Sequence, residues 1–212
     1  MKGLLLKDGY QTVSQMKTMY LTVAVILVVW MFSTSDSYAF PISYAAIFLG
    51  VLPVNLLGYD QNSGWVEYSL TLPVSKKVLV AEKYLVGLLC AAASVVIGGL
   101  FVVVLSLRKG AALDGTALFF VGNGVNTILL MNGISLPLMY RFGAEKARMV
   151  YILTFAGFGA LIAGGGVLVD EFQTNGRFQA SIGLGAALFV VVLVLYLLSW
   201  RLSVAWYGKY KR

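Results

Sequence analysis

Histidine is absent from this sequence of 212 residues, and cysteine occurs once, at Cys90, inside an apolar run. Without histidine the chain has no imidazole for acid–base catalysis, for metal ligation or for a Ser-His-Asp triad. One cysteine cannot form an internal disulfide, so we interpret Cys90 as a small apolar packing residue. The sequence also has no GxSxG, HExxH or CxxC motif and no GxxxxGKS/T loop for ATP phosphates. We therefore expect no enzyme activity, no metal site and no cofactor in this chain itself.

Charged residues are also scarce: they make up 12% of the chain, whereas hydrophobic residues make up 59%. Soluble domains typically carry about 25% charged residues. Several apolar runs reach the roughly 20 residues that a helix needs to cross a bilayer, and a helix bonds its backbone internally in hydrocarbon. We predict an all-α membrane protein in which residues 1–212 form one transmembrane domain. Six transmembrane helices are expected at 19–34, 39–58, 84–107, 115–139, 149–169 and 180–200.

The basic residues predict the orientation of these helices. With both termini in the cytoplasm, the outer loops hold only Arg108, Lys109 and Arg177, and 13 of the 16 Lys and Arg residues lie inside. Cytoplasmic loops of membrane proteins carry such an excess of basic residues. An odd number of spans would place the basic C-terminus outside, which also favours six. The net charge of +7 is thus explained by topology in the cell (cytoplasmic) membrane, and nucleic-acid binding is not indicated.

Residues 1–18 are expected to form an amphipathic helix at the cytoplasmic interface. Apolar side chains recur there at helical spacing, and polar residues fall on the other side. The apolar positions are Leu6, Tyr10, Val13, Met16 and Tyr20. The helix is either a membrane-anchoring lead-in to the first span or a lever that connects cytoplasmic motion to the spans.

The polar residues within the expected spans are mostly amides. Asn55 lies late in the second span, close to Pro53, and the fourth span holds three further asparagines. The near absence of charge disfavours a proton-coupled carrier or a voltage sensor. The amides serve either as hydrogen-bonding groups between helices or as contacts for a transported solute. Small residues at helical spacing in the third, fifth and sixth spans indicate close helix packing, within the chain or at a subunit interface.

The segment 59–83 is the most polar part of the chain, and we predict that it lies on the cytoplasmic side. Asn62 or Ser63 can cap a short helix starting near Gly64. Trp65, Tyr68 and Leu72 share one face of this helix, which we expect Pro73 to end. Ser75 is a plausible cap for a second helix that runs into the third span.

Two interpretations of this segment fit its composition. In the first, the short helix only lies on lipid, with Lys76, Lys77 and Lys83 meeting anionic headgroups. In the second, the short helix is a docking site for a cytoplasmic partner.

The residues Glu67-x-x-Leu-Thr-Leu-Pro-Val-Ser-Lys-Lys, followed by Val80-x-x-Lys83-Tyr84, resemble the signature of small ABC-2-type transporter permeases. The chain is similar to the permease subunits of phenol-soluble modulin exporters. The resemblance implies an ABC-2, type V exporter-like architecture over the whole chain. Larger members of the family have re-entrant helices between the last two spans, whereas the connection Val167–Ala180 is short here.

The resemblance also implies partners. The segment 59–83 would contain the coupling helix that docks on a P-loop ATP-binding cassette subunit, and that subunit would bind ATP and Mg. A second permease chain, identical or homologous, would complete the pore. The implied docking contacts are Trp65, Glu67, Tyr68, Leu70, Leu72 and Pro73. The implied translocation-pathway residues are Asn55, Phe155 and Phe158.

We therefore expect the transmembrane permease subunit of an ATP-driven exporter that moves an amphipathic peptide or a hydrophobic compound out of the cell. The alternative is a non-transporting membrane partner, such as an immunity or sensory subunit. An ATPase gene beside this one would favour transport, whereas a toxin or kinase gene would favour the alternative.

Overall fold

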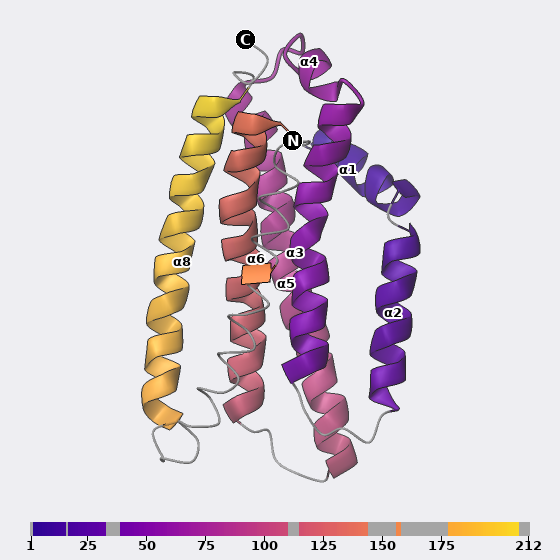
Figure 1. Cartoon of the computed structure of the whole chain (residues 1–212), viewed down its shortest axis with the longest axis vertical. Helices are drawn as coiled ribbons and strands as arrows, with labels where there is room; N and C mark the ends of the chain where they lie inside the picture. The colour runs from indigo at the N-terminus through magenta and orange to yellow at the C-terminus, as the bar shows by residue number, and fades with distance from the viewer. Residues whose placement is uncertain are drawn as a thin grey trace.

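The computed structural model describes residues 2–15, 17–32, 39–109, 115–143, 156–157 and 178–207, and these parts of the chain are all helical apart from short turns. Figure 1 shows long helices running side by side, with shorter helices at one end and on one flank. The named helices are α1 (Lys2–Gln15), α2 (Lys17–Met31), α3 (Ala39–Asn62), α4 (Trp65–Ser69), α5 (Lys76–Lys109), α6 (Gly115–Phe142) and α8 (Phe178–Trp206).

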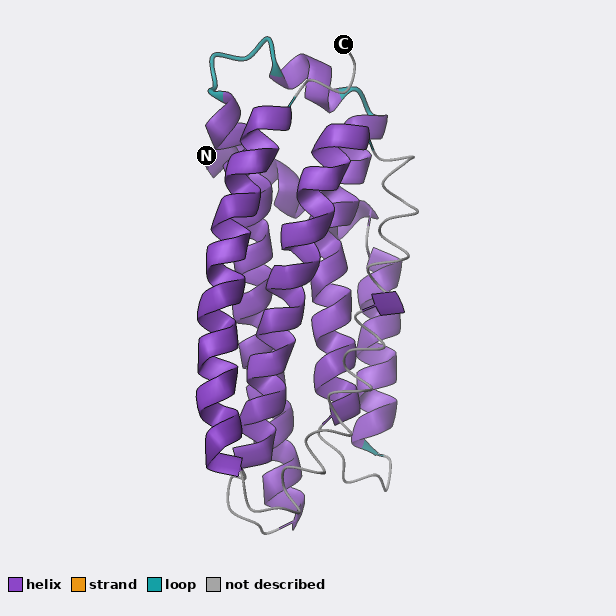
Figure 2. Cartoon of the chain, turned by 60° about the vertical axis from the view of Figure 1, so that its left-hand side comes forward, coloured by secondary structure: helices purple, strands orange, loops and turns teal. Residues whose placement is uncertain are grey.

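Four helices are long and apolar enough to cross a membrane, and they form the bundle seen along its length in Figure 2. Their candidate spans are Phe40–Asn62, Lys76–Arg108, Ala117–Phe142 and Ala187–Trp206. The bundle is centred on α6, which packs against α3, α5 and α8. The expected spans 39–58, 84–107 and 115–139 fall within α3, α5 and α6, and 180–200 falls within α8. Apart from residues 156–157, the expected span 149–169 lies outside the described residues, so the number six stays a prediction.

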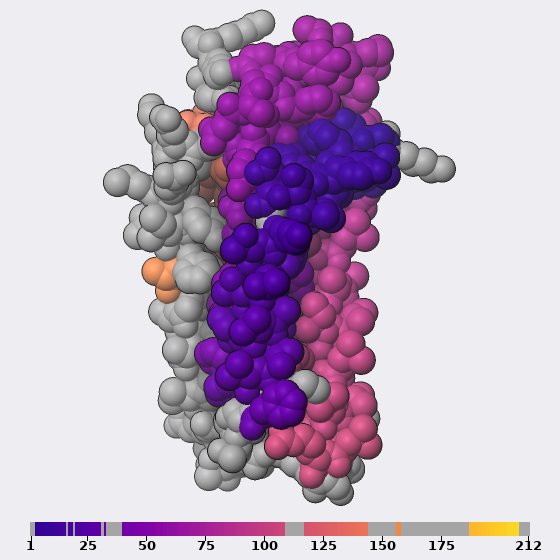
Figure 3. Space-filling view, turned by 90° about the vertical axis from the view of Figure 1, so that its right-hand side faces the viewer, coloured from indigo at the N-terminus to yellow at the C-terminus, as the bar shows by residue number. Residues whose placement is uncertain are grey.

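The N-terminal part forms a bent pair of helices. Residues 3–15 of α1 and 20–30 of α2 meet at 68°, and together they are a fifth candidate span. Figure 3 shows α1 lying across the flank of the bundle, between α2 and the segment that carries α4. Three residues of the predicted apolar stripe point away from the bundle, since Leu6, Tyr10 and Val13 are 63%, 72% and 69% exposed, whereas Tyr20 packs against the core. The three exposed residues are therefore free to meet lipid.

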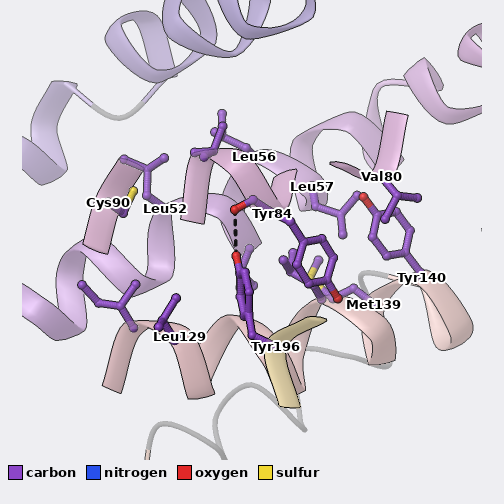
Figure 4. Close-up of a cluster of buried hydrophobic side chains, with 14 of the residues drawn as sticks. Leu52, Leu56, Leu57, Val80, Tyr84, Cys90, Leu129, Met139, Tyr140 and Tyr196 are labelled. Carbon is purple, nitrogen blue, oxygen red and sulfur yellow. Dashed lines mark hydrogen bonds between the residues drawn. The ribbon is translucent and has the colours of Figure 1, made fainter. Parts of the chain in front are cut away.

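The core lies where α3, α5, α6 and α8 meet, toward the end of the bundle that carries α4 (Figure 4). Apolar side chains from all four helices are buried there, and Cys90 is among them, as predicted. Members that are at most 2% exposed include Leu56, Leu57, Val80, Ile128, Leu129, Leu136 and Val192. Along α8, in contrast, most apolar side chains are about half exposed, as expected of a lipid-facing surface.

Hydroxyl groups join α5, α6 and α8 inside this core. The Tyr196 hydroxyl donates a hydrogen bond of 2.8 Å to the Tyr84 carbonyl oxygen, shown as a dashed line in Figure 4. The Tyr84 hydroxyl lies 2.6 Å from Ser199 Oγ and 2.7 Å from Ser203 Oγ. Ser199 Oγ donates to the Gly133 carbonyl oxygen at 2.5 Å. These hydrogen bonds thus fix the relative positions of three helices, which apolar packing alone would specify less strictly.

The amides of α6 differ from the expectation of hydrogen bonds between helices. Asn132 Nδ2 donates to the Ile128 carbonyl oxygen of its own helix at 2.9 Å. The Oδ1 atoms of Asn126 and Asn132 are buried without a hydrogen-bond partner. The amide group of Asn132 therefore does not join α6 to another helix.

Candidate functional site

The polar segment between α3 and α5 forms the end of the bundle. The short helix α4 follows Gly64, whose φ of 74° lies in the left-handed region that glycine adopts without strain. The expected side-chain cap from Asn62 or Ser63 is absent; Gly64 is the N-cap residue, and Ser63 Oγ donates back to the Asp60 carbonyl oxygen at 3.3 Å. The prediction of a side-chain cap was therefore wrong.

The exit from α4 also differs from the prediction. The helix ends at Ser69, and a turn at Leu70–Leu72 precedes Pro73, so the proline does not end the helix. The next helix begins at Lys76 as expected, because the Ser75 carbonyl accepts hydrogen bonds from the N–H groups of Val78 and Leu79 at 3.0 and 3.2 Å.

The helix α4 has an inner and an outer face. Val66 and Ser69 are buried against the bundle, at 7% and 0% exposure. Of the residues implied as docking contacts, Glu67 and Pro73 are exposed, Tyr68 and Leu70 are 57% and 47% exposed, and Trp65 and Leu72 are half-buried. Most of the implied contacts therefore form one outward surface, which we call the α4 outer face (Glu67, Tyr68, Leu70 and Pro73).

The inner face of α4 is bonded to the end of α8. Ser69 Oγ donates to the Val66 carbonyl oxygen at 2.7 Å and lies 2.6 Å from the Tyr207 hydroxyl. Because the single Ser69 proton is used, Tyr207 is the donor of the second bond. Burial raises the pKa of Tyr207 above its ordinary value, so this hydroxyl keeps its proton. The Tyr207 ring also packs on the Tyr140 ring of α6, with centroids 5.6 Å apart.

Below α4, four charged groups form a buried cluster that joins three helices. Lys83 Nζ of α5 lies 2.7 Å from Asp8 Oδ1 of α1 and 2.8 Å from Asp60 Oδ2 of α3. Lys7 Nζ lies 2.8 Å from Asp60 Oδ1 and 3.2 Å from Asp8 Oδ1. The side chains of Lys83 and Asp8 are each 2% exposed. Lys83 is thus enclosed by carboxylates, which corrects the expectation that it meets lipid headgroups.

Trp65 connects this cluster to α4. Lys7 Nζ lies 4.5 Å from the centroid of the Trp65 ring, in the arrangement of a cation–π contact. The Trp65 and Tyr68 rings lie 5.4 Å apart. A small cavity separates α4 from the cluster, and its lining includes Asp60, Trp65, Glu82, Lys83, Tyr140 and Tyr207. The helix α4 is therefore linked to α1 through Trp65 and Lys7, and to the end of α8 through Ser69 and Tyr207.

Sequence reasoning missed Asp8, Asp60 and Tyr207. One available signal was the antiparallel course of α3 and α5, which brings residue 60 to the level of residue 83. Of the implied pathway residues, only Asn55 lies in the described parts of the chain. Asn55 is half-buried in α3, and Phe155 and Phe158 lie outside the described residues.

The described side chains at this end of the bundle join helices to one another. Within the described ranges no group of three acidic, histidine or cysteine side chains could hold a metal ion. The structure instead presents an outward face on α4, and the bonds behind it lead to α1 and α8.

A family model described as "ABC-2 family transporter protein" matches residues 3–208. The matched range includes α1, α4 and the buried charge cluster. No curated protein and no solved structure matches the chain.

Proposed function

The chain belongs to the ABC-2 family of transporter proteins, and from this membership we propose that it is the permease subunit of an ATP-binding cassette exporter. The observation that carries the proposal is the α4 outer face at the polar end of the bundle. It exposes an acid and an aromatic ring on a helix whose inner face is hydrogen-bonded to Tyr207, and two apolar side chains in the turn that follows this helix. An exposed surface on a braced helix can transmit force, whereas an unbraced helix would yield to it.

In this proposal the segment 59–83 holds the coupling helix, and a P-loop ATP-binding cassette subunit binds to it and brings ATP and Mg. Glu67, Tyr68, Leu70 and Pro73 make direct contacts. Trp65 and Leu72 are half-buried, so only part of each side chain contacts the subunit, and both position the exposed residues. Trp65 additionally passes movement to Lys7.

The proposed topology has six spans with both termini in the cytoplasm of a cell-membrane protein. It places α4 and α1 on the side where ATP is available. The excess of basic residues on this side supports it. The exposed stripe of Leu6, Tyr10 and Val13 then lies in the interface of the inner leaflet.

The proposed substrate is an amphipathic peptide or a hydrophobic compound, as for phenol-soluble modulin exporters. The scarcity of charge along the spans supports such a substrate, since a charged solute would need polar partners in the membrane. A second permease chain, identical or homologous, completes the pathway. Asn55, Phe155 and Phe158 are proposed to line it.

Copurification with a coexpressed ATP-binding cassette subunit tests the proposal. Glu67→Lys combined with Tyr68→Ala should abolish copurification, because the double variant reverses a charge and removes a ring on the α4 outer face. Tyr10→Ala is the matched control, since Tyr10 is also an exposed tyrosine, on α1. Undiminished copurification of the double variant, with folding preserved, would show that this face is not the dock.

A further inference from the structure

With Glu82 included, the buried charge cluster contains one more acidic than basic side chain. Two cations, Lys7 and Lys83, face three carboxyl groups, those of Asp8, Asp60 and Glu82. With every group ionised, the cluster would carry a net charge of −1, although Lys83, Asp8 and Glu82 are each only 2% exposed. A buried ionised carboxylate without a partner is strongly disfavoured, and such a group usually takes up a proton instead.

Glu82 is the acid that no cation contacts at hydrogen-bonding distance. Its Oε1 atom is buried with no hydrogen-bond partner, and its side chain is 2% exposed. The same atom lies 3.9 Å from Lys83 Nζ, whereas that ammonium group lies 2.7 and 2.8 Å from the two aspartates. The positive charge of Lys83 is therefore committed to Asp8 and Asp60.

Other groups around Glu82 do not supply the missing positive charge. The negative charge of the Asp8 carboxylate disfavours a second negative charge on Glu82, while Lys7 and Lys83, which attract the Glu82 carboxylate, are each within 3.2 Å of the two aspartates. The charged and titratable groups facing Glu82 are Lys7 and Asp8 of α1, Asp60 of α3, Lys83 of α5, Tyr140 of α6 and Tyr207 after α8.

We infer that Glu82 is a proton-binding site, and that its proton holds α1 against the bundle. With the proton bound, the cluster is neutral, and α1 is fixed by Asp8 to Lys83 and by Lys7 to Asp60. When the proton leaves, the Glu82 carboxylate repels Asp8, and α1 is released. The apolar attachment of α1 to the core comes from Leu4 and Leu5, whereas Leu6, Tyr10 and Val13 face outward, so the charge cluster is the polar part of this attachment.

The direction of the pH dependence follows from the proton count. The docked state binds one proton more than a released state in which Glu82 meets water. The docked state is therefore favoured at low pH. As pH rises, the ratio of docked to released molecules falls, by at most about tenfold per pH unit for one proton. This is opposite to the usual behaviour of a salt-bridged acid, whose stabilising effect is lost as pH falls.

The test measures the distance between α1 and α5 as a function of pH. Spin labels are placed on Gly3→Cys and Lys77→Cys of the full chain in lipid nanodiscs, with Cys90→Ala to remove the native thiol. A side chain at Gly3 meets no atom within 4 Å, and Lys77 is exposed, so the labels disturb little. The wild-type distance distribution should shift from docked to released as pH rises. Glu82→Gln, which carries no titrating group, should stay docked throughout.

Infrared spectroscopy of the unlabelled chain gives a second measurement that does not depend on α1. A carbonyl band of a protonated carboxylic acid should be present at the pH of the docked state and missing in Glu82→Gln. Glu67→Gln is the control, since it removes an exposed carboxyl and should leave both the band and the distance titration unchanged. The inference is overturned if wild type lacks the band, if the band persists in Glu82→Gln, or if that variant retains the wild-type pH dependence. The distance measurement and the infrared band are both independent of transport, so they separate this inference from the proposed exporter function.

Discussion

Gly87 in α5 leaves the space that the Tyr196 hydroxyl occupies, and replacing it with alanine should destabilise the protein. A Cβ atom at this position would lie 2.5 Å from the Tyr196 oxygen, closer than non-bonded atoms approach. That hydroxyl donates its hydrogen bond to the Tyr84 carbonyl, so the bond and the packing of α8 on α5 are lost together.

The expected magnitude comes from three contributions. Alanine is favoured over glycine in a helix by about 1 kcal/mol. Against this, a hydrogen bond between membrane helices contributes about 0.6 kcal/mol on average and up to about 1.7 kcal/mol. Overpacking of a close contact costs about 1–3 kcal/mol. Gly87→Ala should therefore lower the free energy of unfolding by about 1–3 kcal/mol.

Denaturant unfolding in mild detergent, followed by circular dichroism, measures this change. Gly99→Ala is the matched control in the same helix, because a Cβ there meets no atom within 4 Å, and it should be neutral or slightly stabilising. Tyr196→Phe in the Gly87→Ala background removes the clashing oxygen and should recover part of the loss, as a double-mutant cycle would show. A Gly87→Ala variant as stable as wild type, or one that Tyr196→Phe does not improve, would refute the reasoning.

Two further substitutions test the polar end of the bundle. Lys83→Met should lower the free energy of unfolding by about 3–5 kcal/mol, because it removes the buried cation and leaves two buried aspartates with Lys7 alone. Lys76→Met, on the exposed start of the same helix, should change it little, and equal effects would contradict the buried cluster. Tyr207→Phe should remove one hydrogen bond to α4, worth about 1 kcal/mol, and speed limited proteolysis within 63–75. Tyr68→Phe changes an exposed hydroxyl instead, and proteolysis as fast as in Tyr207→Phe would argue against a brace.

The positions of the long helices could be predicted because the length of an apolar run decides whether a helix can span a bilayer. Their ends could not. We expected the second span to end at residue 58, but α3 continues to Asn62, and the charge of Asp60 in this extension is neutralised by Lys7 and Lys83. Those partners lie 53 residues before and 23 residues after it, and no local pattern shows the pairing.

The polar segment was likewise predicted in outline only. Spacing alone suggested that Trp65 and Tyr68 share a face, and their rings do lie close together. Which of them faces outward depends on Lys7, which lies over the Trp65 ring, and on the Ser69 bond to Tyr207, 138 residues away. The role of the α4 outer face in docking stays a prediction until the copurification experiment is done.

The helix α2 is short for a membrane-spanning element, and this has a consequence for the lipid around it. Its 15 residues reach about 22 Å, against a hydrocarbon core of about 30 Å, while the 34 residues of α5 extend about 51 Å. In the proposed topology, the outward apolar stripe of α1 would lie in the inner leaflet beside α2, and a bilayer adapts to such a mismatch by thinning. The lipid would then be thinner beside α2 than around the rest of the bundle, and membrane thickness would bias the angle between α1 and α2.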